Sequence, residues 1–220
     1  TTLFRSLLNI PVNASKQPDK HGYEIKSFKQ GGKVSLMPPT ADMGEEHKLK
    51  FRDFMQDYGW NPVRSRSVTR VFNGAFKYQK KKFCKHIGKN FILDIQGYEA
   101  VSRKFSRNEN AVYVTIRDPE ENLLVSGWSI HKLLSSWNDK HAAACYVEYE
   151  KRKYQGSNPK YKWEYRYSGK VILGEGTDIW KYLEGIGDRV VFYDPAHDIT
   201  VKGKTNQRPQ WRLQVKTDFK

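Results

Sequence analysis

The sequence has few cysteines: only Cys84 and Cys145 are present among its 220 residues. Neither lies in a Cys-x-x-Cys motif or beside clustered histidines, so the sequence indicates neither a disulfide framework nor a structural zinc site. The six histidines show no His-x-x-His pairing and no fixed spacing to a candidate nucleophile. A zinc hydrolase and an enzyme with a Ser/His triad are therefore without support.

Apolar runs long enough to cross a membrane are also missing. The sequence contains no amphipathic helix rich in lysine and arginine and no signal-peptide pattern, so we expect a soluble, intracellular protein with no membrane partner. Internal repeats, low-complexity segments and convincing linkers between domains are absent as well. A chain of this length then predicts a single domain over residues 1–220, with room for a smaller lobe.

Positive charge, in contrast, is abundant. The chain has 39 lysines and arginines against 24 aspartates and glutamates, which gives a formal net charge of +15. This excess is too large for an ordinary solvated surface, and it attracts a polyanion. Nucleic acid is the partner that the composition predicts first.

Hydrophobic periodicity predicts a protein with both helices and strands. Apolar residues at helical spacing predict helices over 51–58, 130–137 and 177–187, after a short N-terminal helix that ends near Ile10. Alternating, β-branched and aromatic residues predict strands over 23–28, 91–95, 112–116, 144–149, 161–167, 190–193 and 211–215. The expected fold class is α/β or α+β, with a central mixed β-sheet flanked by helices.

The candidate catalytic residues lie in the segment Pro18-Asp19-Lys20-His21-Gly22-Tyr23-Glu24-Ile25-Lys26. Side chains of a strand alternate between its faces, so Glu24 and Lys26 share one side, and we expect Tyr23 and Ile25 to pack into the core on the other. Gly22 allows a sharp turn that can bring Asp19 beside Glu24. Paired carboxylates are suitable hard oxygen ligands for Mg²⁺, which polarises a phosphate and acidifies a bound water. Lys26 would orient the attacking water and offset the charge that grows on the phosphorus.

Two alternatives stay open for these residues. Asp19 could be a turn residue, with Glu24 and Lys26 forming an exposed and weakly paired strand face. Glu148 and Glu150 offer a rival metal site, but that segment lacks the matching lysine spacing and a nearby aspartate. We therefore place the catalytic centre at Asp19, Glu24 and Lys26, with the two carboxylates as the metal ligands.

The order of Asp19, Glu24 and Lys26 is that of the PD-(D/E)xK nuclease superfamily. Other pieces follow the order expected of the MvaI/BcnI type II restriction endonucleases, whose opening is similar to that of the mismatch-repair nuclease MutH. These pieces are Leu7-Leu8-Asn9-Ile10, Asn13, Pro18-Asp19, Gly22 to Ser27, Ser35-Leu36 with Pro38, Phe54-Met55 with Tyr58-Gly59, Phe91 to Gly97, Gly127-Trp128-Ser129 with Leu133-Leu134 and Trp137, and Val191 to Asp194. The chain thus resembles the MvaI/BcnI family over most of its length.

The resemblance implies a PD-(D/E)xK core with a DNA-recognition lobe. The catalytic segment would lie near residues 1–60, and the recognition segments in the middle and C-terminal parts. The implied activity is Mg²⁺-dependent cleavage of double-stranded DNA at a short, near-palindromic, GC-rich sequence. The implied setting is a type II restriction system in a prokaryotic cytoplasm, with a cognate methyltransferase as a further partner.

The chain departs from the family's pattern at one position. Family members commonly carry an additional acidic residue on the N-terminal helix, and the matching position here is Arg5. A basic residue at this position weakens the case for a second metal site and favours one-metal chemistry at Asp19 and Glu24.

Because Asp-x4-Glu-x-Lys occurs once and the resembling enzymes act as single chains, we expect a monomer.

Two basic stretches could hold the DNA. They comprise Lys77, Lys80, Lys81, Lys82, Lys85 and Lys89, and then Lys202, Lys204, Arg208, Arg212 and Lys216. Lysines suit phosphate contacts, whereas an arginine can bind guanine O6 and N7 bidentately, so Arg208 and Arg212 are candidates for base reading. The resemblance adds His197 and Asp198, because similar enzymes read bases near the C-terminus. The predicted DNA-binding set is His21, Lys80, Lys81, Lys82, His197, Asp198, Lys204, Arg208 and Arg212. A merely solvated face is the alternative for each of them.

Aromatic residues alternate with charged residues at Tyr161, Trp163, Tyr165 and Tyr167. The interpretation we favour is an amphipathic strand whose aromatic face is core, and the alternative is a stacking platform for single strands.

Two rival functions also stay open for the whole chain. One is a MutH-like strand-nicking endonuclease that needs an activating partner. The other is a catalytically inert, sequence-specific DNA-binding module.

Overall fold

The computed structural model describes residues 6–10, 19–29, 31–62, 65–84, 87–138 and 143–215. Five residues considered above lie outside these ranges: Arg5, Asn13, Pro18, Lys85 and Lys216. The chain divides into two compact units. The first unit comprises Thr1–Val34, Trp137–Asp178 and Leu213–Lys220, and the second unit comprises Ser35–Ser136 and Ile179–Arg212.

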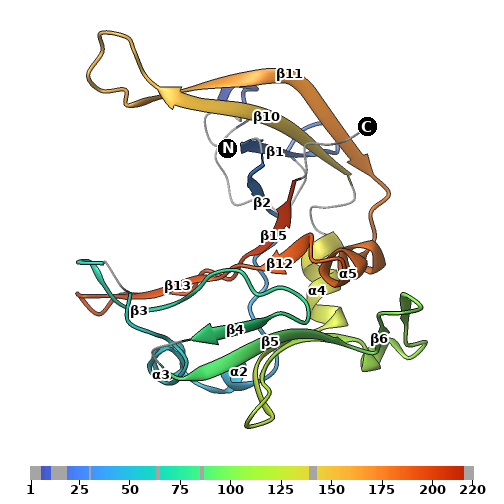
Figure 1. Ribbon diagram of the computed structural model, residues 1–220. Helices are drawn as coiled ribbons and strands as arrows, with labels where there is room; N and C mark the ends of the chain where they lie inside the picture. Colours follow the sequence, from blue (N-terminus) through green and yellow to red (C-terminus); the bar gives the residue numbers. More distant parts are fainter. Residues whose placement is uncertain are drawn as a thin grey trace. The chain divides into compact units, whose positions relative to one another are not determined.

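The first unit is built on a mixed three-stranded sheet in the order β1-β10-β11 (Figure 1). Its strands are β1 (Glu24–Lys29), β10 (Ala143–Lys153) and β11 (Trp163–Glu175). β1 runs parallel to β10, from Glu24 opposite Ala144 to Lys29 opposite Tyr149. β11 runs antiparallel to β10 and is longer than the strand predicted over 161–167, because its pairing with β10 continues as far as Ala143.

A small apolar cluster closes one face of this sheet. Phe28 of β1 packs there with Val34 and Val215, against the partly buried Tyr146, Ile172 and Leu213. Phe28 shares its strand face with Glu24 and Lys26, since side chains alternate along β1. The core face of β1 is therefore the face that carries the two charged residues. The expectation that Tyr23 and Ile25 would form the core face is wrong, because both are only half-buried.

Two short strands, β2 (Lys33–Ser35) and β15 (Trp211–Gln214), lie side by side. In the first unit the backbone N–H of Val215 donates to the carbonyl of Gly32 at 3.2 Å. In the second unit the N–H of Leu36 donates to the carbonyl of Trp211 at 2.7 Å.

The second unit contains an antiparallel sheet in the order β4-β5-β8-β9. Its strands are β4 (Lys81–Cys84), β5 (Lys89–Gln96), β8 (Tyr113–Asp118) and β9 (Leu123–Ser129). A second sheet has the order β14-β13-β3, with β14 (Thr205–Asn206), β13 (Ala196–Thr200) and β3 (Val68–Asn73). Smaller strands are β6 (Tyr98–Glu99), β7 (Lys104–Phe105) and β12 (Val191–Tyr193).

Aromatic side chains form the interior of the second unit. The rings of Trp128 and Tyr193 lie 4.6 Å apart between centroids, and Trp211 lies 5.2 Å from each of them. All three are fully buried. Burial of such large apolar surfaces is the main term that stabilises this unit.

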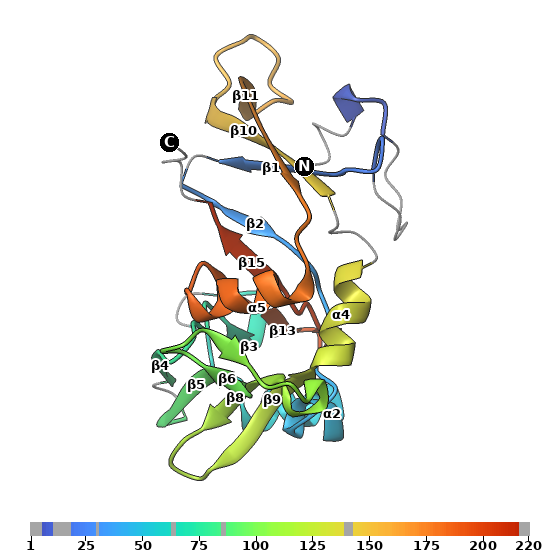
Figure 2. The ribbon, with the colours of Figure 1, turned by 90° about the vertical axis from the view of Figure 1, so that its right-hand side faces the viewer.

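Helices are few and short. They are α2 (Glu45–Lys48), α3 (Phe51–Asp57), α4 (Ile130–Asn138) and α5 (Ile179–Gly187), with a 3₁₀ turn over Glu109–Ala111. Figure 2 shows α4 and α5 most clearly. The helices predicted over 51–58, 130–137 and 177–187 are therefore confirmed within two residues, and so is the α+β class. None of the described helices is long and apolar enough to span a membrane.

Candidate active site

The centre of the candidate site is a carboxylate and an ammonium on one face of β1. Lys26 Nζ lies 2.8 Å from Glu24 Oε1, and the Glu24 residue is only 3% exposed. A buried charge is costly unless an opposite charge or hydrogen bonds compensate it. The prediction that Glu24 and Lys26 share a face is thus met, but as a buried ion pair rather than an exposed strand surface.

A tight turn precedes this strand and sets the place of Asp19. Lys20 and Tyr23 exchange two backbone hydrogen bonds, of 3.1 Å and 2.8 Å, around His21 and Gly22. Both central residues have positive φ, 50° for His21 and 81° for Gly22, which is the combination of a type I′ turn. Gly22 accepts this conformation without strain. The chain therefore reverses here, so that Asp19 lies beside β1.

One contact measures how close Asp19 comes to the strand. Its Oδ2 atom accepts a hydrogen bond from the backbone N–H of Ile25 at 3.1 Å. Ile25 lies between Glu24 and Lys26 in the sequence, so the turn brings Asp19 alongside the segment that carries the ion pair. The sharp turn expected at Gly22 is present in the structure.

The second oxygen of the Glu24 carboxylate shows what the site could hold. Glu24 Oε2 is buried and has no hydrogen-bond partner among the described residues. A buried carboxylate oxygen without a partner is costly, and a cation can satisfy it. Among the residues that the structure describes, no three His, Cys, Asp or Glu side chains form a possible metal cluster. Asp19 and Glu24 therefore stay the candidate ligands, and a hard cation that keeps several waters fits such a sparse set.

Tyr146 of β10 is a neighbour of the site that the sequence analysis missed. It lies opposite Lys26 in the parallel ladder. Burial raises the pKa of the Tyr146 phenol, and the charge of Glu24 raises it further. The sequence predicted that Tyr146 lies on a strand. Nothing in the neighbouring residues, however, indicates that this strand pairs with β1.

The rival pair Glu148 and Glu150 lies elsewhere on β10. Glu148 stands opposite Phe28, next to an irregularity in the β10–β11 pairing. Its Oε2 accepts from the Ser168 hydroxyl at 3.4 Å, and its Oε1 is buried without a hydrogen-bond partner among the described residues. Glu150 is exposed and lies opposite Arg166. Among the described residues, no lysine is paired with Glu148 as Lys26 is with Glu24, so the β1 face has the better-matched groups.

The lysine run over 80–82 divides into two kinds of side chain. Lys80 and Lys81 are exposed. Lys82 instead donates to the carbonyl of Asn73, and its ammonium lies 3.8 Å from the ring centroid of Phe76. The Lys82 ammonium therefore contacts other residues of the second unit, whereas Lys80 and Lys81 are exposed to solvent.

The structure places His197 in the interior of the second unit. The backbone N–H of Arg208 donates to His197 Nδ1 at 2.9 Å, while Nε2 lies 3.3 Å from both Glu46 Oε1 and the Tyr193 hydroxyl. The ring is fully buried, so in this structure it presents no surface to a base. It fixes the backbone of Arg208. Glu46 is a buried charged partner that the sequence analysis did not identify.

Arg208 and Arg212 both face carboxylates. Arg208 pairs with Asp198, and its side chain is 54% exposed. Arg212 Nε lies 2.9 Å from Asp194 Oδ2, and its side chain is 25% exposed. A carboxylate behind a guanidinium can hold it in one orientation, which suits bidentate recognition.

Two other candidates lie at exposed turns. Lys204 precedes β14, and its backbone N–H donates to the Thr200 hydroxyl. His21 lies in the turn beside Asp19.

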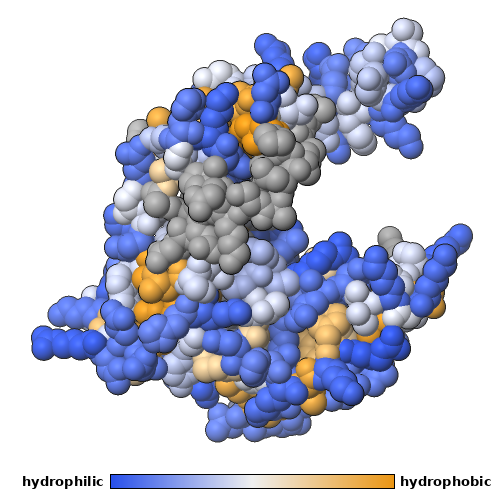
Figure 3. All heavy atoms as spheres, turned by 180° about the vertical axis from the view of Figure 1, so that it is seen from behind, coloured by the Kyte–Doolittle hydropathy of each residue, from blue (hydrophilic) through white to orange (hydrophobic). Residues whose placement is uncertain are grey.

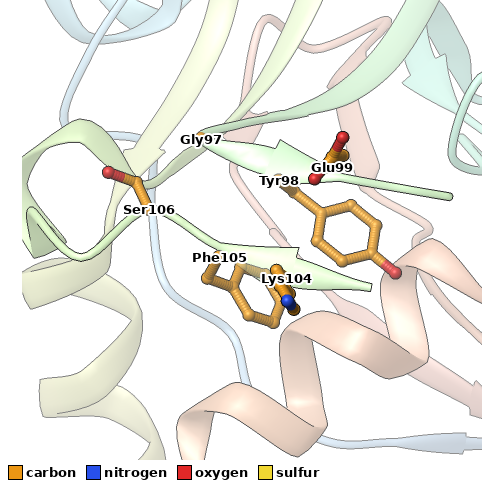
Figure 4. Close-up of a pocket in the computed structure, with 6 residues that line it drawn as sticks. All are labelled: Gly97, Tyr98, Glu99, Lys104, Phe105 and Ser106. Atoms are coloured by element: carbon orange, nitrogen blue, oxygen red, sulfur yellow. The ribbon is translucent and has the colours of Figure 1, made fainter. Parts of the chain in front are cut away.

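A surface pocket in the second unit has a different character. Its lining consists of Gly97, Tyr98, Glu99, Lys104, Phe105 and Ser106 (Figure 4). The Tyr98 and Phe105 rings stack with centroids 4.7 Å apart, and Glu99 lies opposite Lys104 in the β6–β7 pair. With one carboxylate and no second acidic residue in its lining, the pocket lacks the groups of the β1 site.

Comparisons with known proteins agree over nearly the whole chain. The family model described as "MvaI/BcnI restriction endonuclease family" matches residues 2–218. The solved structure titled "Restriction endonuclease MvaI-cognate DNA substrate complex" is similar with a TM-score of 0.72 and 16% identity, covering 97% of this chain and 81% of that chain. "Restriction endonuclease MvaI in the absence of DNA" is similar with a TM-score of 0.55 and 15% identity, covering 96% and 77%. At these identities the structural likeness shows the fold. A search of curated protein sequences found no match.

Proposed function

Because the chain belongs to the MvaI/BcnI restriction endonuclease family, which makes it a type II site-specific endonuclease, we propose that it cuts double-stranded DNA with Mg²⁺ at a short specific sequence. Asp19, Glu24 and Lys26 are its catalytic centre in this proposal. The observation that carries it is the buried Glu24, with one oxygen on Lys26 and the other without a hydrogen-bond partner among the described residues.

The residues would divide the chemistry as follows. Asp19 and Glu24 hold the metal, and when bound Mg²⁺ polarises the scissile phosphate and acidifies a water. Lys26 donates to the attacking water and offsets the charge that develops on the phosphate oxygens. The low exposure of Glu24 favours this role, because an ion pair acts more strongly where water is excluded.

The two units would divide the work in the same proposal. The first unit contains the catalytic residues, and the second contains the DNA-binding candidates other than His21. Lys80, Lys81 and Lys204 would contact phosphates, while Arg208 and Arg212 would read bases. Asp198 would orient Arg208 or accept directly from a cytosine.

We further propose that the enzyme acts as a monomer in a prokaryotic cytoplasm, with a cognate methyltransferase as its partner in the system. The catalytic motif occurs once in the chain.

Incubation with supercoiled plasmid, with Mg²⁺ or with chelator, tests the activity. Discrete fragments that require Mg²⁺ are expected, and sequencing of their ends gives the recognition site. Accumulation of nicked circles as the final product would instead favour a MutH-like nickase. A gel shift without cleavage would favour an inert binding module. Glu24→Gln is the matched control, since it removes a charge at the proposed metal site and leaves the second unit unchanged.

A further inference from the structure

The outer half of the β10–β11 hairpin is a two-stranded ribbon. The pairing of β1 with β10 ends at Lys29 opposite Tyr149. Beyond that point β10 pairs with β11 alone, from Glu150 opposite Arg166 to Lys153 opposite Trp163. Figures 1 and 2 show this end of the hairpin and its connecting loop extending past β1. We call residues 150–166 the ribbon.

Large aromatic side chains are exposed on the ribbon. Tyr161 is 61% exposed, Trp163 is 51% exposed and Tyr165 is 38% exposed. For these three residues the interpretation as a core face is wrong, because β10 and β11 pair with no described third strand here. Tyr167, the fourth residue of that interpretation, is half-buried. Water-exposed tryptophan and tyrosine on one segment are unfavourable unless a partner covers them, and such patches mark interaction surfaces.

Cations surround these rings. The ribbon carries Lys151, Arg152, Lys153, Lys160, Lys162 and Arg166 against Glu150 and Glu164. Lys151 Nζ lies 4.3 Å from the ring centroid of Trp163 and 5.9 Å from that of Tyr165. Glu164 pairs with Arg152. In Figure 3 the end of the hairpin is drawn almost entirely in blue and pale shades. The exposed aromatic surface is thus strongly cationic, which excludes an apolar partner and favours a polyanion.

We propose that the ribbon binds duplex DNA outside the cut sequence. The partner follows from charge complementarity and from the substrate class, so the inference rests on the proposed function. The lysines and arginines would contact phosphates, and Trp163 and Tyr165 would pack on the sugar backbone. A two-stranded β-ribbon has the width that fits the major groove, and phosphate contacts fix position without reading sequence. The ribbon thereby adds affinity for flanking DNA.

The test compares two triple variants of the full chain in chelator, so that the DNA stays uncut. Lys151→Gln, Lys153→Gln and Lys162→Gln remove three charges from the ribbon. Lys48→Gln, Lys50→Gln and Lys104→Gln remove three charges from exposed positions of the second unit. Binding to a long non-specific duplex is measured as a function of salt. Each neutralised phosphate contributes about 0.9 to the log–log salt slope, so the slope should be shallower by roughly 2 to 3 in the ribbon variant and unchanged in the control.

Three results overturn the proposal. The first is an equal slope in the ribbon variant and the wild type, and the second is an equally shallow slope in the control triple. A ribbon variant that loses single-stranded binding but keeps duplex binding also overturns it, because the partner is then an unpaired strand.

Trp163→Ala is a second variant that keeps the charge. It should weaken duplex binding several-fold without changing the salt slope, and undiminished binding would contradict the packing role.

Plasmid cleavage keeps the two proposals apart. If wild type cuts plasmid and the ribbon variant binds normally, the ribbon inference fails and the endonuclease stands. If wild type does not cut but the ribbon variant loses duplex affinity, the proposed activity fails and the ribbon stands.

Discussion

Lys26 Nζ and Glu24 Oε1 lie 2.8 Å apart on a face of β1 that continues into the apolar cluster at Phe28. The ammonium compensates a carboxylate that burial would otherwise leave costly. Lys26 thus stabilises the free protein in addition to its proposed role in catalysis. Thermal stability measures the first role, and plasmid cleavage measures the second.

Asp19→Ala, Glu24→Ala and Lys26→Ala should each remove plasmid cleavage on the time scale at which wild type completes it, and leave duplex binding largely intact. The reason is that the three residues act on metal and water rather than on the recognition surface. For Lys26→Ala the loss in kcat should be about 10² to 10³-fold, the range for removal of one transition-state donor. Normal cutting by any of the purified variants would move the centre elsewhere, with Glu148 next in line.

Lys26→Ala should also lower the thermal stability in chelator, because Glu24 is then buried without its ammonium. Removing one partner of a buried pair costs up to about 3 to 5 kcal/mol, and the partial exposure of Lys26 places the effect at the lower end. Lys29→Ala, at an exposed position of the same strand, is the control. Added Mg²⁺ should restore part of the stability of Lys26→Ala, and a variant as stable as the control would argue against the buried ion pair.

Lys80 and Lys81 should contribute to DNA binding, whereas Lys82 should contribute mainly to stability. Replacing Lys80 and Lys81 with glutamine should flatten the salt slope by about 0.9 for each phosphate that these lysines neutralise. Lys82→Gln should mainly lower stability, because Lys82 contacts the Asn73 carbonyl and the Phe76 ring. An unchanged slope in the double variant would show that these lysines do not face the DNA.

Arg208→Ala and Arg212→Ala should relax discrimination between cognate and altered sites. Removal of one bidentate arginine–guanine pair costs about 1 to 3 kcal/mol of specificity. Competition binding with single-base variants of the recognition site measures the effect at each position. A uniform drop in affinity at every site would instead assign the arginine to the phosphate backbone.

At limiting enzyme, nicked circles should appear before linear plasmid. A monomer with one site cuts the strands in separate events, whereas a symmetric dimer places two sites on both strands at once. A time course on supercoiled plasmid follows the intermediate, and light scattering on the complex with a short duplex gives the number of chains. Direct conversion to linear product by a two-chain complex would rule out the monomer and leave the catalytic assignment unaffected.

Stability should fall in alkaline solution, above a pH of about 10. Burial raises the pKa of the Tyr182 phenol well above its ordinary value of 10.0. Above that value the unfolded chain has lost this proton and the folded chain retains it, so the unfolding free energy declines as pH rises. Tyr182→Phe should show a smaller decline in denaturant titrations, while Tyr161→Phe, at an exposed position, should follow wild type. Parallel declines in all three proteins would contradict the assignment to Tyr182.

Local patterns were enough to predict much of the fold and part of the site. The family and the enzyme class predicted from the order of the motifs are confirmed. The pairing of Glu24 with Lys26 follows from the two-residue period of a strand, and the turn at Gly22 from the conformations open to glycine. These features depend only on neighbours in sequence.

What local patterns missed depends on distant partners. Alternation along residues 161–167 identifies a strand, but it does not tell whether another layer covers its aromatic face. His197 was expected at the DNA because of its position near the C-terminus, yet its ring is fully buried beside the rings of Phe51 and Phe72, which are distant from it in sequence. Tyr146 reaches Lys26 only through the register of β10.

Because β1 pairs with β10, the sheet of the first unit can form only after both strands have been synthesised. Parallel neighbours need a long connection, and here residues 30–142 separate the two strands in sequence. Pairings of such large sequence separation form late, because the loop entropy is lost before the contacts form. A chain still on the ribosome, with β10 not yet made, therefore contains Asp19, Glu24 and Lys26 as residues but has no sheet to hold them. The proposed catalytic centre would therefore assemble only once β10 has been synthesised, and the host's DNA would not be cut before then.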